Sequence, residues 1–241
     1  KHILGLPESQ ILLLNQNRSD GEILDEIEKF LNSTWGDTLI FYFAGHGFRA
    51  KTGEFFLVTN NTNLKRVPKS SISWDEIKKL FETGDYGIQQ RFYILDACHS
   101  GAATLGGEET LEIAKGSALL AAAKANKKSY FDENEEHTYF TAALFETLRE
   151  GVRNLGKPTL SVQSLFNKME TKLQDKNFDL EMKTTDRINE VNFFLNKSFD
   201  EIALLVKEGD DFFDKTEYPA AIAKYSKALV LCNKKKDYAK A

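Results

Sequence analysis

The stretch RFYILDACHSG, residues 91–101, decides the fold. Its apolar run at residues 92–95 is typical of a strand that is covered on both faces, as in a parallel sheet. The run leads directly into Asp96, Cys98 and His99, where a bland turn residue is usual, and a glycine follows. A carboxylate, a thiol and an imidazole at the end of a buried strand indicate a reactive loop.

A second buried strand ends in the same manner. The stretch DTLIFYFAGHG, residues 37–47, is an unbroken β-branched and aromatic run that places His46 between two glycines. His46 and Cys98 are 52 residues apart, which is enough for a hairpin, a crossover helix and a return to a neighbouring strand. Ligands of open parallel sheets bind beyond the carboxyl ends of the strands. We therefore expect both side chains to face one crevice.

Strand-like and helix-like segments alternate along the rest of the first 198 residues. The strand-like runs lie at residues 11–17, 37–47, 53–60, 91–98, 116–124 and 190–196. The helical patterns lie at residues 19–34, 73–84, 138–151 and 159–176. This alternation predicts an α/β fold, with a mainly parallel sheet flanked by helices.

The last part of the chain, residues 199–241, carries only helical periodicity. The spacing of Gly209, Phe212, Ala221, Tyr225 and Ala228 resembles a tetratricopeptide repeat, in which small residues let two antiparallel helices pack closely. One repeat cannot bury its own face, so we expect it to dock on the first domain or to continue in further repeats. A plain helical hairpin is the alternative. The predicted domains are thus residues 1–198 and residues 199–241.

The two polar strand ends suit nucleophilic catalysis. A free thiol has a pKa of about 8.5, and a nearby imidazole can take or share its proton. Cys98 is then the candidate nucleophile and His46 the candidate base. The backbone N–H groups of Gly47 and Cys98 are candidate donors to a developing oxyanion.

FAGHG at residues 43–47, followed by LDACHSG at residues 95–101, resembles the caspase-like cysteine peptidases of the caspase–metacaspase clan, bacterial type. Caspases place the histidine about 50 residues ahead of the cysteine. The resemblance covers residues 1–198. It implies a caspase-like fold and a cysteine endopeptidase with a protein or peptide substrate. The repeat tail would receive a regulatory protein partner.

Two other functions compete with this interpretation. The first is a catalytically silent scaffold that binds protein partners through the tail, and the presence of both His46 and Cys98 argues against it. The second is redox sensing by Cys98, which lacks a resolving cysteine nearby, since Cys232 is the only other cysteine.

Asp96 stands where caspases themselves carry glutamine, and metacaspase-like and clostripain-like relatives carry aspartate. The resemblance to those relatives implies cleavage after Arg or Lys. Strand alternation points Asp96 and Cys98 the same way, and a carboxylate there would pair with a substrate cation. The alternative is that Asp96 only holds the loop in shape.

Bacterial relatives often show a further acidic residue after the next strand, which makes Asp132 a second substrate-binding candidate. The alternative is a solvated acidic loop.

The resemblance raises two further expectations. Caspase relatives often mature by cutting the loop after the nucleophile, and Lys115 is the single basic residue of residues 101–117. Self-cleavage after Lys115 is therefore one alternative, and an uncut linker is the other.

In the family's sheet, one strand lies between the strands that correspond to the runs at residues 11–17 and 37–47. That strand has no counterpart in this sequence. We expect another piece of the same parent protein to supply it, because a sheet without it would expose two edges.

Composition excludes several other classes of function. The chain is 41% hydrophobic and 28% charged with a net charge of −4, so we expect no contact with nucleic acid. No apolar run approaches the roughly 20 residues of a membrane helix. Two distant cysteines indicate neither a disulfide framework nor a zinc site, and they favour a cytoplasmic setting. We expect no metal or cofactor. Some metacaspase relatives need calcium, and acidic loops are too common to decide that need here.

Overall fold

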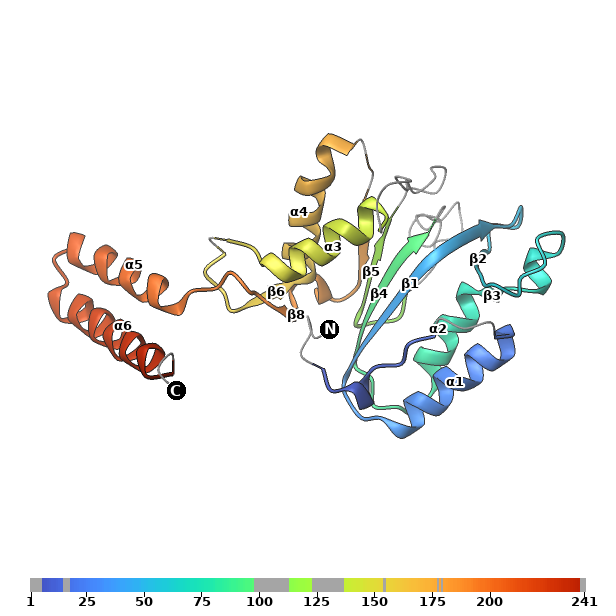
Figure 1. Cartoon of the computed structure of the whole chain (residues 1–241), viewed down its shortest axis with the longest axis horizontal. Coiled ribbons are helices and arrows are strands. Elements are labelled where there is room, and N and C mark those ends of the chain that lie inside the picture. The colour runs from blue at the N-terminus through green and yellow to red at the C-terminus, as the bar shows by residue number, and fades with distance from the viewer. Residues whose placement is uncertain are drawn as a thin grey trace.

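The computed structural model describes residues 6–14, 18–97, 113–122, 137–153, 155–176, 178 and 180–238. It has a central sheet with helices on both faces and a helical hairpin that projects to one side (Figure 1). The predicted α/β class is confirmed.

Among the described residues, the main sheet has six strands in the order β3-β2-β1-β4-β5-β7. Its strands are β1 (Thr38–Arg49), β2 (Phe55–Val58), β3 (Ile72–Ser73), β4 (Gln90–Ala97), β5 (Ser117–Ala121) and β7 (Glu181–Thr184). The three central strands β1, β4 and β5 are parallel, whereas β2, β3 and β7 join antiparallel at the two sides. The sheet is therefore mixed, with a parallel centre.

Capped helices cover both faces of this sheet. The helices on the sheet are α1 (Asp20–Ser33), α2 (Trp74–Thr83), α3 (Tyr139–Glu150) and α4 (Val162–Leu173), and those of the tail are α5 (Glu201–Asp214) and α6 (Tyr218–Tyr238). Short 3₁₀ turns lie at Glu8–Gln10, Val67–Lys69, Gln174–Lys176 and Ile188–Glu190. The side chains of Ser19 and Ser73 cap α1 and α2 in capping boxes, as the sequence predicts. Helices α1 and α2 lie on one face of the sheet, and α3 and α4 lie on the other (Figure 1).

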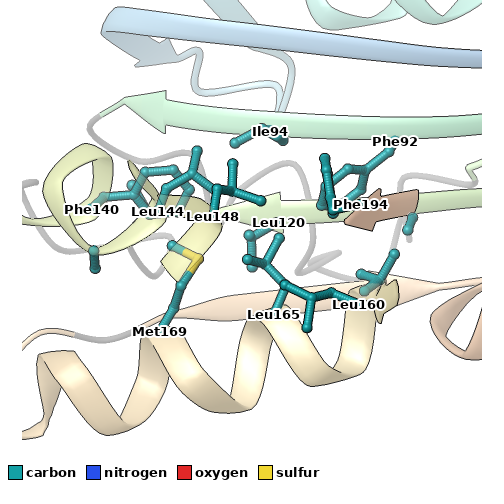
Figure 2. Close-up of a cluster of buried hydrophobic side chains, with 14 of the residues drawn as sticks. Phe92, Ile94, Leu120, Phe140, Leu144, Leu148, Leu160, Leu165, Met169 and Phe194 are labelled. Atoms are coloured by element: carbon teal, nitrogen blue, oxygen red, sulfur yellow. The ribbon is translucent and has the colours of Figure 1, made fainter. Parts of the chain in front are cut away.

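Two hydrophobic cores hold these layers together. One packs α1 and α2 against the sheet around Trp74 and Tyr93. The other joins Ile94 of β4 and Leu120 of β5 to Leu165 of α4, among the residues drawn in Figure 2. Every residue of β4 after Gln90 is buried, which confirms the expectation of a strand covered on both faces.

Three predicted segments differ from the structure. Residues 11–14 are not a strand, because among the described residues they have no neighbouring strand to bond with; Ile11 and Leu13 are exposed. The run at 190–196 forms β8 (Asn192–Leu195), which pairs with β6 (Thr159–Ser161) in a separate two-stranded sheet and not in the main one. Residues 159–161 are thus strand, and the helix predicted from residue 159 begins at Val162. Strand β7, which the sequence did not predict, completes the main sheet.

Strand β1 is more exposed than its apolar sequence predicts. Its partner β4 covers one edge of Thr38–Gly45, whereas β2 covers the other edge only from His46 to Arg49. No strand among the described residues pairs with the second edge of Thr38–Gly45, and Tyr42 is 40% exposed. The described residues 11–14 do not fill this edge, so the expected additional strand stays a prediction.

The backbone groups of β1 alternate in direction. The carbonyl of Asp37 accepts the amide of Gln90 at 2.9 Å, and in a parallel pair every second residue bonds to the same neighbour. Odd-numbered residues of β1 therefore direct their N–H and C=O groups toward the side of β4. Even-numbered residues direct theirs toward the opposite side, where β2 pairs with the end of the strand.

The tail is a helical hairpin of α5 and α6. A Cβ on Gly209 would meet the Tyr225 ring at 2.4 Å, so glycine permits the close approach of the two helices. Lys224 and Glu208 pair at 2.6 Å across them. The helical hairpin is confirmed, and its identity as a tetratricopeptide repeat stays a prediction. Every helix among the described residues is too short or too polar to span a bilayer.

Candidate active site

The register of β1 and β4 controls which residues meet at the carboxyl edge of the sheet. Thr38 pairs with Gln90, 52 residues later, and the same offset continues to Gly45 and Ala97. His46 follows Gly45, and Cys98 follows Ala97. Cys98 lies outside the described residues, and Ala97, the last described residue of β4, pairs with Gly45, the residue before His46.

The His46 side chain shares a face of the sheet with Asp96. Ala44 pairs with Asp96, and registered residues of neighbouring strands point to the same face. His46 is two residues beyond Ala44 and therefore points to that face as well. Its imidazole is exposed, so a substrate can reach it.

The amide of Gly47 points toward the side of β4. The Ala50 amide donates to the Glu54 carbonyl at 2.9 Å, which makes this pair of the β1–β2 hairpin a hydrogen-bonded one. Hydrogen-bonded and non-hydrogen-bonded pairs alternate, so Gly47 and its partner Leu57 form a non-hydrogen-bonded pair. The Gly47 N–H is thus directed away from β2. It lies one residue after His46, where the described part of β4 has already ended.

Asp96 is a buried carboxylate with one oxygen hydrogen-bonded and the other without a partner among the described residues. The residue is 2% exposed. Its Oδ2 accepts hydrogen bonds from the hydroxyls of Thr138 and Thr141 at the start of α3. Its Oδ1 is buried and has no hydrogen-bond partner among the described residues. Buried acceptors are usually paired, so this oxygen is a candidate ligand-binding atom.

Burial raises the pKa of Asp96, and the hydrogen bonds from Thr138 and Thr141 oppose that rise without cancelling it. The hydroxyls of Tyr42 and Thr141 lie 2.6 Å apart, so the polar cluster continues onto β1. Burial also raises the pKa of Tyr42, with a hydrogen bond to Thr141 opposing and the charge of Asp96 adding. The site therefore holds a buried carboxyl group that lacks a cationic partner among the described residues.

The structure brings together some of the predicted site residues and not others. His46, Gly47 and Asp96 lie at the carboxyl edge of the sheet. Cys98, with its backbone N–H, and Asp132 fall outside the described residues. Lys115 is exposed in a turn just before β5, whose first residue pairs with Arg91 at the beginning of β4. Lys115 thus lies at the amino ends of the parallel strands, opposite the carboxyl ends where His46 lies.

Sequence reasoning missed three residues that contact or support Asp96, namely Tyr42, Thr138 and Thr141. The available signal was the helix beginning at residue 138, since Thr138 caps α3 and Thr141 stands three residues later. The start of a helix that follows a strand of a parallel sheet lies at the same edge as the polar strand ends.

Within the described ranges, no three His, Cys, Asp or Glu side chains are grouped so that they could hold a metal ion. The polar groups that the structure does gather are one imidazole, one buried carboxylate and three hydroxyls.

Comparison with known proteins places this geometry in a family. A sequence model described as the caspase domain matches residues 12–199. The crystal structure of caspase-1 from Spodoptera frugiperda superposes with a TM-score of 0.48 at 13% identity, over 74% of this chain and 73% of that one. No curated protein sequence matches the chain. Because the caspase domain match covers well over half of the residues, this chain belongs to the caspase domain family of peptidases.

Proposed function

We propose that the protein is a cysteine endopeptidase that uses Cys98 and His46 and cleaves after Arg or Lys. The observation that carries this proposal is the shared register of β1 and β4, which has the same offset as the spacing of His46 and Cys98. A base and a nucleophile on neighbouring parallel strands reach one edge only when register and spacing agree.

The chemistry needs few parts. His46 takes the proton of the Cys98 thiol, and the thiolate attacks the carbonyl carbon of the substrate peptide bond. The carbonyl oxygen becomes an oxyanion, which the Gly47 N–H stabilises from the side of β1. The amine then leaves with the proton from His46, and water hydrolyses the thioester to release the acid and regenerate Cys98.

Selectivity for a cation is supported by the free Oδ1 of Asp96. Asp96 is two residues before Cys98, and burial keeps water from screening its charge. A substrate guanidinium or ammonium would satisfy the oxygen that has no partner among the described residues. An acidic side chain would be repelled there.

The test uses four fluorogenic peptides that differ only in the residue before the cut: Arg, Lys, Asp or citrulline. Citrulline keeps the shape of Arg without its charge. We expect hydrolysis of the Arg and Lys peptides and no hydrolysis by Cys98→Ala. Intact mass spectrometry should also show a peptidyl-Arg acyloxymethyl ketone bound to the wild type at Cys98. A folded wild type that neither cleaves these peptides nor takes the label would refute the proposal and favour the silent scaffold.

We further propose that the α5–α6 hairpin receives a protein that regulates the peptidase. The support is its exposed apolar side chains, which are Val206, Phe213, Tyr218, Ile222, Leu229 and Val230. Ile222 and Leu229 are seven residues apart on α6 and share one face. The double variant Ile222→Lys/Leu229→Lys should keep basal hydrolysis and lose stimulation by any protein that activates the wild type. Full stimulation of this variant would place the regulatory contact elsewhere.

A further inference from the structure

We infer that Thr138, Thr141 and Tyr42 are positioning residues that hold Asp96 by one oxygen and leave the other for a substrate cation. This inference rests on the proposed function. It assigns the selectivity of the site to a polar cluster built from β1, β4 and α3.

The direction of each hydrogen bond in the cluster follows from the number of available hydrogens. A hydroxyl has one hydrogen, and the hydroxyls of Thr138 and Thr141 both donate theirs to Oδ2 of Asp96. The Thr141 hydroxyl lies 2.6 Å from that of Tyr42 and has no second hydrogen, so Tyr42 is the donor of that bond. The Thr138 oxygen accepts the Thr141 amide at 3.1 Å, which fixes the Thr138 hydroxyl in turn. Every hydroxyl donor of the cluster thus points toward Asp96 or toward a group that donates to it.

This arrangement is asymmetric in a useful way. Two donors bind Oδ2, while Oδ1 is buried with no partner in the described part of the chain. A carboxylate held only to cap α3 would gain from pairing both oxygens, because a buried acceptor without a partner is unfavourable. The asymmetry is the expected one for a carboxylate that awaits a charged donor.

The cluster also affects the protonation of Asp96. Burial raises its pKa, and the two threonine hydroxyls oppose this. Losing one of them should raise the pKa further, so that less of the carboxylate is charged at a given pH. The titratable groups at this end of the sheet on the described elements include Tyr42 and His46 on β1, His137 and Tyr139 at the start of α3, and Glu181 of β7, which pairs with Ala121 at the end of β5. The ring of His137 packs edge-on against Phe145, with centroids 5.2 Å apart.

The alternative is a purely structural role, in which Thr138 caps α3 and Thr141 packs beside it. Three variants separate the two roles. Thr141→Val keeps the shape of the side chain and removes the donor to Oδ2, whereas Thr141→Ser keeps the donor. Tyr42→Phe removes the hydroxyl that donates to Thr141 but leaves both donors to Asp96, so its effect should be intermediate.

The first measurement needs no activity. In protein labelled with ¹³C at the aspartate carboxyl, a pH titration by NMR reports the pKa of Asp96, and Asp96→Asn assigns the signal. We expect Thr141→Val to raise this pKa by about one unit, since one unit corresponds to the loss of one good hydrogen bond to the charged form. Thr141→Ser should match the wild type, and Tyr42→Phe should fall between them. An unchanged pKa in Thr141→Val would overturn the inference whether or not the protein is a peptidase.

The second measurement adds a cation. Benzamidine, an amidinium probe, should shift the Asp96 carboxyl signal in the wild type and bind Thr141→Val roughly tenfold more weakly. With Arg peptides, the same variant should show a raised KM and a nearly unchanged kcat. In its pH profile, the fall of kcat/KM on the acid side should occur at a higher pH than in the wild type. His46→Ala identifies the part of the pH profile that belongs to the imidazole. Benzamidine that leaves the Asp96 signal unmoved would refute the cation site. Benzamidine binding without peptide hydrolysis would support the positioning role while refuting the peptidase proposal.

Discussion

Replacing Asp96 with asparagine, D96N, keeps the shape of the side chain and removes its charge. Asp96 is 2% exposed, so its interaction with a substrate cation is little screened by water. Removal of one partner of a buried ion pair costs about 3–5 kcal/mol. Asparagine retains an oxygen that can accept a hydrogen bond, so we take the lower value. About 3 kcal/mol corresponds to a loss of roughly 150-fold in kcat/KM for Arg peptides.

The assay compares an Arg peptide with its citrulline counterpart in the wild type and in D96N. The wild type should strongly prefer Arg, and D96N should lose that preference because only the charge has been removed. Hydrolysis of the citrulline peptide should be unchanged, which controls for misfolding. Retention of the Arg preference by D96N, or an equal loss on both peptides, would refute the assignment of Asp96 to the substrate cation.

The stability of D96N provides an independent check on the same burial. The pKa of Asp96 is raised above its ordinary value of 3.8, so ionisation of this group disfavours the folded state above the raised pKa. That penalty disappears as the pH falls below the ordinary value. In urea unfolding, D96N should therefore be at least as stable as the wild type at neutral pH, and its advantage should shrink toward acid. A wild type that is more stable than D96N at neutral pH and loses this advantage in acid would indicate a paired carboxylate.

Three other predictions concern β1, the tail hairpin and the turn before β5. The Tyr42 amide points to the edge of β1 that has no partner among the described residues, so in hydrogen exchange it should exchange much faster than that of Phe43, which points to β4; comparable protection would show that a strand covers that edge. Gly209→Ala brings a Cβ within 2.4 Å of the Tyr225 ring and should destabilise the hairpin by about 1–3 kcal/mol in thermal unfolding, despite the better helix propensity of alanine. A higher melting temperature would contradict this packing. Lys115 lies in a turn next to β5, so mass spectrometry of the incubated protein should show no cut there; a fragment ending at Lys115 that Cys98→Ala abolishes would support the self-cleavage alternative instead.

Much of the fold was predictable because it depends on local sequence. The capping boxes at Ser19 and Ser73 involve residues three apart, and the apolar run before Asp96 needs only its own pattern to predict a buried strand. The expectation that β1 is a buried strand was met only in part, for a non-local reason: its side chains pack against both cores, but none of its residues is fully buried. Its apolar residues match a buried strand, but its burial depends on what lies beyond its edge, and no strand among the described residues lies there.

The features of the site likewise divide into those set by local sequence and those set by contacts between distant segments. The types and the spacing of His46 and Cys98 are properties of the sequence alone, and together with Asp96 they indicate a reactive strand end. The register that carries His46 to the end of β4 had to be inferred from chain length, and only backbone pairing between distant strands decides it. The partners of Asp96 come from α3, more than 40 residues later, so its half-bonded state was invisible in the sequence.

The sequence by itself determined that a thiol, an imidazole and a carboxylate follow apolar runs, because side-chain chemistry and hydrophobic pattern are properties of the order of residues. Tertiary structure alone decided which oxygen of Asp96 is held, which edge of β1 lacks a neighbour among the described residues and which way the Gly47 amide points. Those properties arise from hydrogen bonds and burial between segments far apart in the chain, and no local pattern encodes them.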